Sequence, residues 1–245
     1  MVLSRALATL AVLVPLALST AALAMTVTPT QLEMVSTGSA SRAQITVVNN
    51  GAAPLPVEVV IQRAALDETG LPKTSKAGDE FLVMPPQALI APGATQNFRV
   101  QWLGNPLIES SESFLVYMNQ IPVKLPQGKS AVQVVMSMGV MVNVAPPRGV
   151  PSLQIVETGV MTDTHGRRHP TITVQNLSNV HALLPQATVY LASGSWSQTL
   201  TPGFLSEKIG IGLVQPGKRR KFVLPADVPA DVTTLQASLD FRPKR

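Results

Sequence analysis

Short runs of alternating apolar and polar residues recur along the chain, and proline, glycine and asparagine residues separate them. Alternation with a period of two is typical of β-strands, and segments with helical periodicity are scarce. The 21 prolines and 16 glycines interrupt the chain often. The pattern therefore predicts an all-β protein, and its candidate strands in the first half are residues 44–48, 56–62, 96–102, 114–118 and 131–147.

The last of these strands has one wholly apolar face. Residues 131–147 read AVQVVMSMGVMVNVAPP and carry no charge. Every second residue is apolar, namely Val132, Val134, Met136, Met138, Val140, Val142 and Val144. A strand from Val132 to Val144 would extend roughly 40 Å, which is longer than one β-sandwich needs. Three explanations are open: a core strand with both ends covered, the edge of an oligomer, and a strand kept available for another chain.

The two halves of the chain contain similar segments. The first half has ITVVNNG at 45–51 and LIAPGATQNFRV at 89–100, and the second has ITVQNLSN at 172–179 and LVQPGKRRKFVL at 213–224. The offset between the aligned Asn49 and Asn176 is nearly the same as the offset between Pro92 and Pro216. These similar offsets predict two tandem copies of one β-sandwich plan, with chance similarity of short fragments as the alternative.

A stretch rich in proline and glycine divides the two halves. Residues 145–151 read APPRGVP. Proline fixes its own φ angle and pushes the preceding residue toward an extended conformation, so a short and stiff elbow is expected. We predict a first domain at 25–145, a hinge at 146–150 and a second domain at 151–245. Each is near the usual domain size of about 100 residues.

The segment 1–24 has the pattern of a cleaved secretory signal. Arg5 precedes an apolar stretch at 6–18, and small residues end at Ala24. The apolar stretch is too short for a membrane anchor, which needs about 20 residues. The signal and the absence of cysteine together indicate the bacterial periplasm. We expect an exported protein that begins at Met25 and has no stable membrane insertion.

The chain carries a small positive charge. The formal net charge is +5, and basic runs lie at 218–221 (KRRK) and 242–245 (RPKR). Nucleic acid is not an expected partner of an exported chain, so we interpret the charge as solvated surface, with an anionic membrane or a polar partner as the alternative. The first run lies in a predicted strand, where charges discourage edge-to-edge pairing.

The sequence has no arrangement of residues that is typical of an enzyme. His165 and His169 lie close to Asp163, but two arginines between them would repel a metal cation, so we predict a polar hairpin. His181 is isolated in the sequence. No serine lies in a G-x-S-x-G motif, and no phosphate-binding glycine motif or cysteine nucleophile is present. We therefore predict a non-enzymatic protein without cofactor or metal.

Three segments together resemble a known family. LIAPGATQNFRVQW (89–102) is similar to the family's Pro-Gly turn and following strand, ESFLVYMNQIP (112–122) is similar to its aromatic-rich strand, and residues 131–147 take the place of the last strand of its first domain. The family is that of the PapD-like periplasmic chaperones of the chaperone–usher pathway, which assemble pili and fimbriae. The resemblance covers nearly all of the mature chain. It implies two tandem immunoglobulin-like β-sandwich domains, joined at a short elbow in a boomerang arrangement.

The resemblance also implies a mechanism, donor-strand complementation. The last strand of the first domain would complete the unfinished sandwich of a pilus or fimbrial subunit, and the chaperone would deliver that subunit to an outer-membrane usher. The lent side chains would be Val132, Val134, Met136 and Met138, whereas Val140, Val142 and Val144 would stay in the chaperone's own core. The preceding loop at 123–130 would be mobile until a subunit binds.

One departure from the family concerns the anchor for the subunit's C-terminal carboxylate. Family members hold that carboxylate with an Arg in the first strand and a Lys in the donor strand, but the corresponding positions here are Gln31 and Met141. Either the alignment shifts by a residue or two, or the chain represents a divergent branch with another anchor. The candidate cations are Arg99, Arg42 and Arg148, with ordinary surface arginines as the alternative.

A different class of function stays open at this point. The two domains would also suit a structural or adhesive module of the cell envelope without a client subunit. Residues 131–145 would then belong to the core or to the edge of a homodimer. The sequence also leaves open whether a client-free chaperone forms a homodimer.

Overall fold

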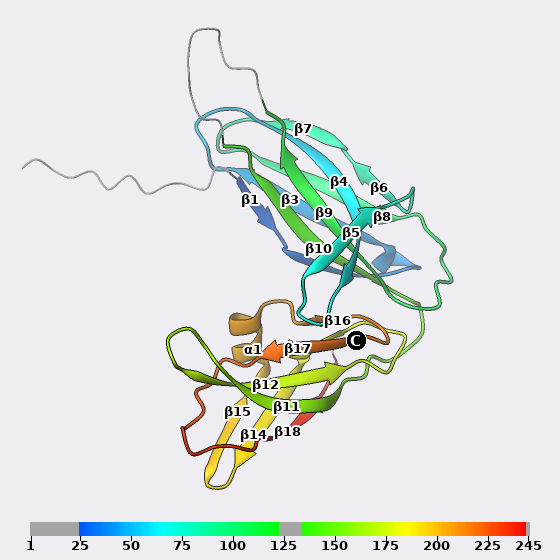
Figure 1. The fold of residues 1–245 in the computed structure, drawn as a ribbon. Helices are drawn as coiled ribbons and strands as arrows, with labels where there is room; N and C mark the ends of the chain where they lie inside the picture. Colours follow the sequence, from blue (N-terminus) through cyan, green and yellow to red (C-terminus); the bar gives the residue numbers. More distant parts are fainter. Residues whose placement is uncertain (1–24, 123–133, 244–245) are drawn as a thin grey trace, which may run out of the picture.

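The fold consists of two β-sandwich domains, which confirms the predicted fold class. The computed structural model describes residues 25–122 and 134–243, and Figure 1 shows its strands in two groups, one above the other. The first domain contains β1 (Met25–Thr28), β2 (Gln31–Val35), the 3-10 helix η1 (Ser39–Ser41), β3 (Arg42–Asn49), β4 (Leu55–Leu66), β5 (Pro72–Lys76), β6 (Phe81–Met84), β7 (Gln87–Ile90), β8 (Thr95–Trp102), β9 (Glu112–Gln120) and β10 (Ser137–Ala145).

Two sheets enclose the core of the first domain. One sheet has the strand order β1-β3-β8-β6, and the other has β2-β10-β9-β4-β5, with β7 paired to β4. The predicted strands 44–48, 56–62, 96–102 and 114–118 lie within β3, β4, β8 and β9. Alternate residues of these strands point inward, because successive side chains of a strand face opposite sides of its sheet. The largest fully buried side chains of this core are Phe98, Phe114, Met25, Met34, Ile45 and Met118.

The start of the chain divides its pairing between the two sheets. β1 pairs antiparallel with β3 in one sheet, and β2 pairs parallel with β10 in the other. The crossing takes place at Pro29 and Thr30, between the two strands. A single continuous strand would have followed one sheet only, so this crossing limits how much of β10 the chain's own start can cover.

The second domain is built around a separate core. It contains β11 (Gln154–Thr162), β12 (Arg168–Gln175), β13 (Ala182–Leu183), the 3-10 helix η2 (Leu184–Gln186), β14 (Ala187–Ser193), β15 (Trp196–Leu200), α1 (Pro202–Ile209), β16 (Leu213–Val214), β17 (Arg219–Val223) and β18 (Gln236–Phe241). The strand orders are β11-β12-β17, β15-β14-β18 and β13-β16. Ile172, Leu184, Leu191, Leu200 and Leu205 are among the fully buried side chains.

The helix α1 has a conventional start. Thr201 is its N-cap, and the Thr201 hydroxyl accepts a hydrogen bond from the backbone N–H of Phe204 at 3.5 Å. Pro202 occupies the first helical position, where its missing N–H is not needed. Within the described residues, no helix has the length and hydrophobicity needed to cross a membrane.

The predicted repeat is visible in two equivalent asparagines. Asn49 and Asn176 are both buried, and each side chain bridges two segments of its own domain. Asn49 Nδ2 donates to the carbonyls of Ala53 and Ile90 at 2.8 and 2.9 Å. Asn176 Nδ2 donates to the carbonyls of Val180 and Val214 at 2.8 and 3.0 Å, in the same relative positions. In each domain, therefore, an asparagine at the end of one strand is hydrogen-bonded to the segment that leads into the Pro-Gly turn. We call this shared arrangement the common plan of the two domains.

The segment around His165 and His169 forms the predicted polar hairpin between β11 and β12. Asp163 Oδ1 accepts hydrogen bonds from the backbone N–H groups of His165 and Arg167, both at 2.9 Å. The Asp163 carboxylate also pairs with the side chains of Arg167 and His169. Burial favours the neutral form of Asp163, but these hydrogen bonds outweigh it and hold the pKa of this carboxyl far below its usual value.

Candidate functional site

One edge of β10 is only partly covered. β9 pairs with β10 on one side from Ser137 to Val144. On the other side, β2 pairs only with Met141–Ala145, beginning where the Met141 N–H donates to the Thr30 carbonyl at 3.0 Å. In the part of the chain that the structure describes, no strand pairs with the β2 side of residues 137–140. We call residues 134–140 on this side the open edge.

The apolar face of this segment passes from the core to solvent. Val140, Val142 and Val144 are fully buried, as predicted. Met138 and Met136 are half-buried and pack against the same core. Val134 is 75% exposed. The apolar face that fills the first core therefore continues beyond it along the open edge.

The strand itself is shorter than the alternating pattern predicts. β10 begins at Ser137, and residues 134–136 precede it without strand pairing. Met136 is nevertheless held at the end of β9, because its carbonyl accepts a hydrogen bond from the Gln120 N–H at 2.8 Å. Of the four predicted donor side chains, Val134, Met136 and Met138 follow one another along this segment. Val132 and the predicted loop at 123–130 lie outside the described residues.

The opposite face of β10 meets the second domain. Met141 is only 7% exposed and packs with Leu115 of β9, Ala64 of β4 and Leu213 of the second domain. We call these four side chains the inter-domain cluster. Its position means that the sheet carrying the open edge is also the sheet on which the second domain rests.

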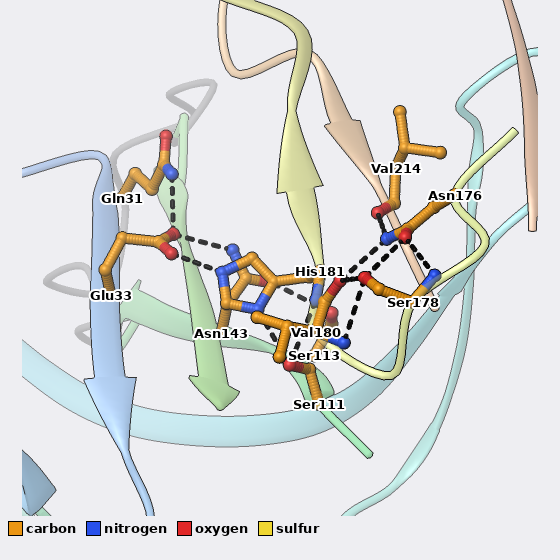
Figure 2. A network of polar contacts seen from close by, with 10 residues as sticks. All are labelled: Gln31, Glu33, Ser111, Ser113, Asn143, Asn176, Ser178, Val180, His181 and Val214. Carbon is orange, nitrogen blue, oxygen red and sulfur yellow. Dashed lines mark hydrogen bonds and ion pairs between the residues drawn. The ribbon is translucent and has the colours of Figure 1, made fainter. Parts of the chain in front are cut away.

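A polar network continues the contact between domains, and Figure 2 shows it. At its centre is the carboxylate of Glu33 on β2. Glu33 Oε1 accepts hydrogen bonds from Gln31 Nε2 at 2.7 Å and from Asn143 Nδ2 at 2.9 Å. Glu33 Oε2 contacts Nε2 of His181, which belongs to the second domain. The buried Asn143 is oriented by the Ser113 hydroxyl, which donates to its Oδ1 at 2.8 Å.

His181 is fixed at both of its ring nitrogens. Its side chain is 6% exposed, and Nδ1 lies 3.0 Å from the Ser111 hydroxyl oxygen. The backbone of the same region is tied across the interface, because the Ser111 N–H donates to the Asn179 carbonyl at 2.9 Å. The imidazole therefore has one orientation, with Nε2 directed at Glu33.

The charge of Glu33 follows from these contacts. Partial burial acts to raise its pKa, but the hydrogen bond and charge of His181 and the bonds from Asn143 and Gln31 outweigh burial. The pKa of Glu33 therefore lies below its usual value, and the side chain is a carboxylate at neutral pH. A negative group therefore lies on β2 beside Asn143 of β10.

The structure brings together Gln31 and Met141, the two uncharged residues at the expected anchor positions. They are direct neighbours in the register of β2 and β10. Neither supplies a positive charge, because the Gln31 amide donates to Glu33 and the Met141 thioether is part of the inter-domain cluster. Both side chains are thus used for contacts within the chain.

The three candidate anchors lie in two different places. Arg42 and Arg99, on β3 and β8, line one shallow pocket of about 490 Å³ on the other sheet of the first domain. Arg148 lies in the elbow and lines a pocket of about 700 Å³ together with Glu33 and His181. Of the three, only Arg148 therefore lines the pocket at the elbow, between the domains.

The elbow has its own steric requirement at Gly149. Its φ of 138° is favoured by glycine. A Cβ at this position would lie 2.5 Å from Val180 Cγ2. The elbow therefore packs directly on the loop that carries His181.

The sequence pattern gave no indication of the pair formed by Glu33 and His181. The two residues lie 148 positions apart, and His181 is isolated among apolar neighbours in the sequence. No local periodicity connects residues at that separation.

Comparisons with known proteins identify relatives of this chain. The sequence of residues 24–149 matches the family described as pili and flagellar-assembly chaperone, PapD N-terminal domain. A comparison with curated protein sequences gives no significant match.

Several solved structures have a similar fold. A chain in the complex of Salmonella enterica SafA pilin with the SafB chaperone is 16% identical, with coverage of 84% of this chain and 86% of that chain and a TM-score of 0.54. The class 5 fimbriae chaperone CfaA is 12% identical, with coverage of 90% and 100% and a TM-score of 0.52. A chain in the CsuC–CsuE chaperone–tip adhesion subunit complex of Acinetobacter baumannii is 15% identical, with coverage of 88% and 97% and a TM-score of 0.51. At these identities the similarity concerns the fold.

Proposed function

This chain belongs to the family of pili and flagellar-assembly chaperones, and from that premise we propose that it binds pilus or fimbrial subunits by donor-strand complementation through β10. Chaperones of this family act by binding, so the protein is not an enzyme. In the proposed reaction, an incomplete subunit sandwich takes up residues 132–138 of the chaperone as its missing strand. No cofactor is needed, because the folding energy of the subunit drives its capture.

The observation that carries this proposal is the open edge of β10 with its graded apolar face. A partner strand laid along residues 134–140 would gain main-chain hydrogen bonds that β2 does not use. Val134 is exposed, and Met136 and Met138 are half-buried, so all three have apolar surface left to bury. Each such side chain contributes about 1.5–3 kcal/mol when it is fully buried. Together with Val132, they would supply enough binding energy for a partner that cannot complete its own core.

The pocket at the elbow suggests how the C-terminal end of the subunit would be held. Of the three candidate cations, Arg148 is the one that lines the pocket at the elbow. We propose that Arg148 pairs with the carboxylate end of the bound subunit, whereas Gln31 and Met141 contribute no charge. Arg42 and Arg99 lie together on the other sheet, so they are weaker candidates for this role.

The remaining parts of the proposal follow from the sequence and the family. The signal at 1–24 would direct the chain to the periplasm, and the domains would extend over 25–145 and 151–245 with a hinge at 146–150. A loaded chaperone would then pass its subunit to an outer-membrane usher. A client-free molecule with an exposed apolar edge would be able to protect that edge by forming a homodimer.

The test is the co-purification of subunits from the native host. Tagged wild-type protein would be isolated from the periplasm together with Val134→Asp/Met136→Asp and with the control Leu89→Asp/Leu177→Asp, which changes two exposed leucines away from the open edge. We expect small β-rich subunits with the wild type and the control, and at least a tenfold loss with the open-edge variant. Equal capture by all three folded proteins would contradict the proposal.

A further inference from the structure

A hairpin of the first domain extends to the second domain. In Figure 1 the connection between β4 and β5 reaches the second domain beside β16. We call residues 64–71, the end of β4 and the following turn, the strap. The side chain of Gln215 pairs with the strap as a neighbouring strand would: Gln215 Nε2 donates to the Ala64 carbonyl, and Gln215 Oε1 accepts from the Leu66 N–H, both at 2.8 Å.

The turn of the strap also covers an edge strand of the second domain. The N–H of Lys221 in β17 donates to the Glu68 carbonyl at 2.7 Å. β17 is the outer strand of its sheet and pairs with β12 on its other side. The strap thus satisfies part of an edge that would otherwise lack a neighbour in the described structure.

Gly70 makes this close approach sterically possible. Its φ is 90°, and a Cβ at this position would clash with the guanidinium of Arg220. That guanidinium is held in place by the Phe222 ring, whose centroid is 4.7 Å from Cζ, and by the Leu213 carbonyl, which accepts from Nη1 at 2.6 Å. Because Arg220 has little freedom to move, any larger residue at position 70 would push the strap away from the second domain.

A second contact lies at the opposite edge of the same sheet. The strand order β2-β10-β9-β4-β5 places Glu33 of β2 at one edge and the strap at the other. Glu33 contacts His181, and Met141 and Leu115 of the inter-domain cluster lie on β10 and β9 in between. Rotation about the elbow would have to break polar contacts at one edge or the other, whichever way the second domain turned.

We propose that the strap and the Glu33–His181 contact together lock the angle between the two domains. Domains joined by a short linker are expected to move relative to one another unless their interface restrains them. Here the restraint is built into a hairpin of the first domain, so the open edge and the second domain form one rigid surface. This inference concerns the free protein and holds whether or not β10 is lent to a subunit.

The experiment measures the distance between the domains by pulsed electron spin resonance. The native chain has no cysteine, so Gln44→Cys and Thr199→Cys, at exposed positions of β3 and β15, would be its only labelling sites. We expect one narrow distance population for this pair in the otherwise native chain. Gly70→Ala should broaden the distribution at least twofold, and Gln215→Ala should broaden it in the same direction by less.

The matched control is Gly93→Ala. Gly93 also has a positive φ, of 70°, but a Cβ there would have no neighbour within 4 Å. It therefore introduces the same kind of backbone strain in the same domain without touching the second domain. Gln215→Ala keeps the test decisive if Gly70→Ala does not fold. The proposal is overturned by a broad distribution in the native background, by equal widths in the native background and in Gln215→Ala, or by broadening in Gly93→Ala as large as that in Gly70→Ala.

Discussion

Two strand edges of this protein, one on β10 and one on β17, have opposite character. The open edge of β10 is uncharged and mostly apolar, and β2 leaves residues 137–140 without a strand neighbour on that side. The edge strand β17 carries Arg219, Arg220 and Lys221, and the strap of the other domain covers part of it. Charges on an edge strand discourage pairing with other chains. The edge of β17 is thus protected from pairing with other chains by its charged residues and by the strap. The open edge of β10 has neither protection.

The contrast is sharper because the two domains otherwise follow one plan. Asn49 and Asn176 make the same set of bonds, and a glycine with positive φ follows proline at Gly93 and Gly217. Features that both domains share are those that the fold itself requires. The open edge of β10 lies outside this shared plan, in which β17 corresponds to β8 and not to β10.

The largest effect on stability is expected from replacing either of the two equivalent asparagines, Asn49 or Asn176. Asn49→Ala and Asn176→Ala would each remove two hydrogen bonds from the side-chain amide to backbone carbonyls, which should lower the free energy of unfolding by about 2–4 kcal/mol. Denaturant unfolding of both variants measures this loss. The exposed Asn50, changed to Ala, is the control and should alter stability by about 0.5 kcal/mol or less. A small loss in one domain and a large one in the other would contradict the shared plan.

A somewhat smaller loss of stability should distinguish a substitution at the buried end of the β10 segment from one at its exposed end. Val142 is fully buried and Val134 is 75% exposed. Val142→Ala should destabilise the free protein by about 1.5–3 kcal/mol, and Val134→Ala should cost about 0.5 kcal/mol or less. Thermal or denaturant unfolding of the client-free protein distinguishes them. Equal losses would mean that residue 134 belongs to the core and is not kept available.

The contact between Glu33 and His181 should give a modest dependence on pH. The folded state lowers the pKa of Glu33 below 4.5, so the stabilisation is present above that value and is lost as the pH falls through the folded pKa. Because Glu33 is half-exposed, we expect only about 0.5–1 kcal/mol. The difference in unfolding free energy between wild type and Glu33→Gln should be present at pH 7 and should shrink as the pH falls below 4.5. The exposed Glu207, changed to Gln, should show no such difference, and a Glu33 effect that persisted in acid would argue against this origin.

The fold could be predicted from the sequence because the patterns that indicate it involve short stretches of the chain. Alternation predicted β3, β4, β8 and β9, and the repeated Asn and Pro-Gly positions predicted two copies of one plan. Each of these signals depends on residues that are close in the chain. Val140, Val142 and Val144 were placed in the core for the same reason.

The contacts between domains could not be predicted in this way. Glu33 meets His181 across 148 positions, and Gln215 meets Ala64 across 151. Neither pair has a motif, because any polar residue of suitable length would serve if the domain angle brought it close. The start of β10 at Ser137 was also missed, since apolar alternation continues through residues 134–136 although no strand pairing does.

The most direct measurement for the central claim is amide hydrogen exchange of the free protein and of its purified complex with a co-purified subunit. If β10 is lent along its open edge, amides of residues 134–140 should become strongly protected in the complex, whereas those of β17 at 219–223 should exchange at the same rate in both states. Unchanged exchange at 134–140, with protection elsewhere, would contradict strand lending and would place the subunit on another surface of the chaperone.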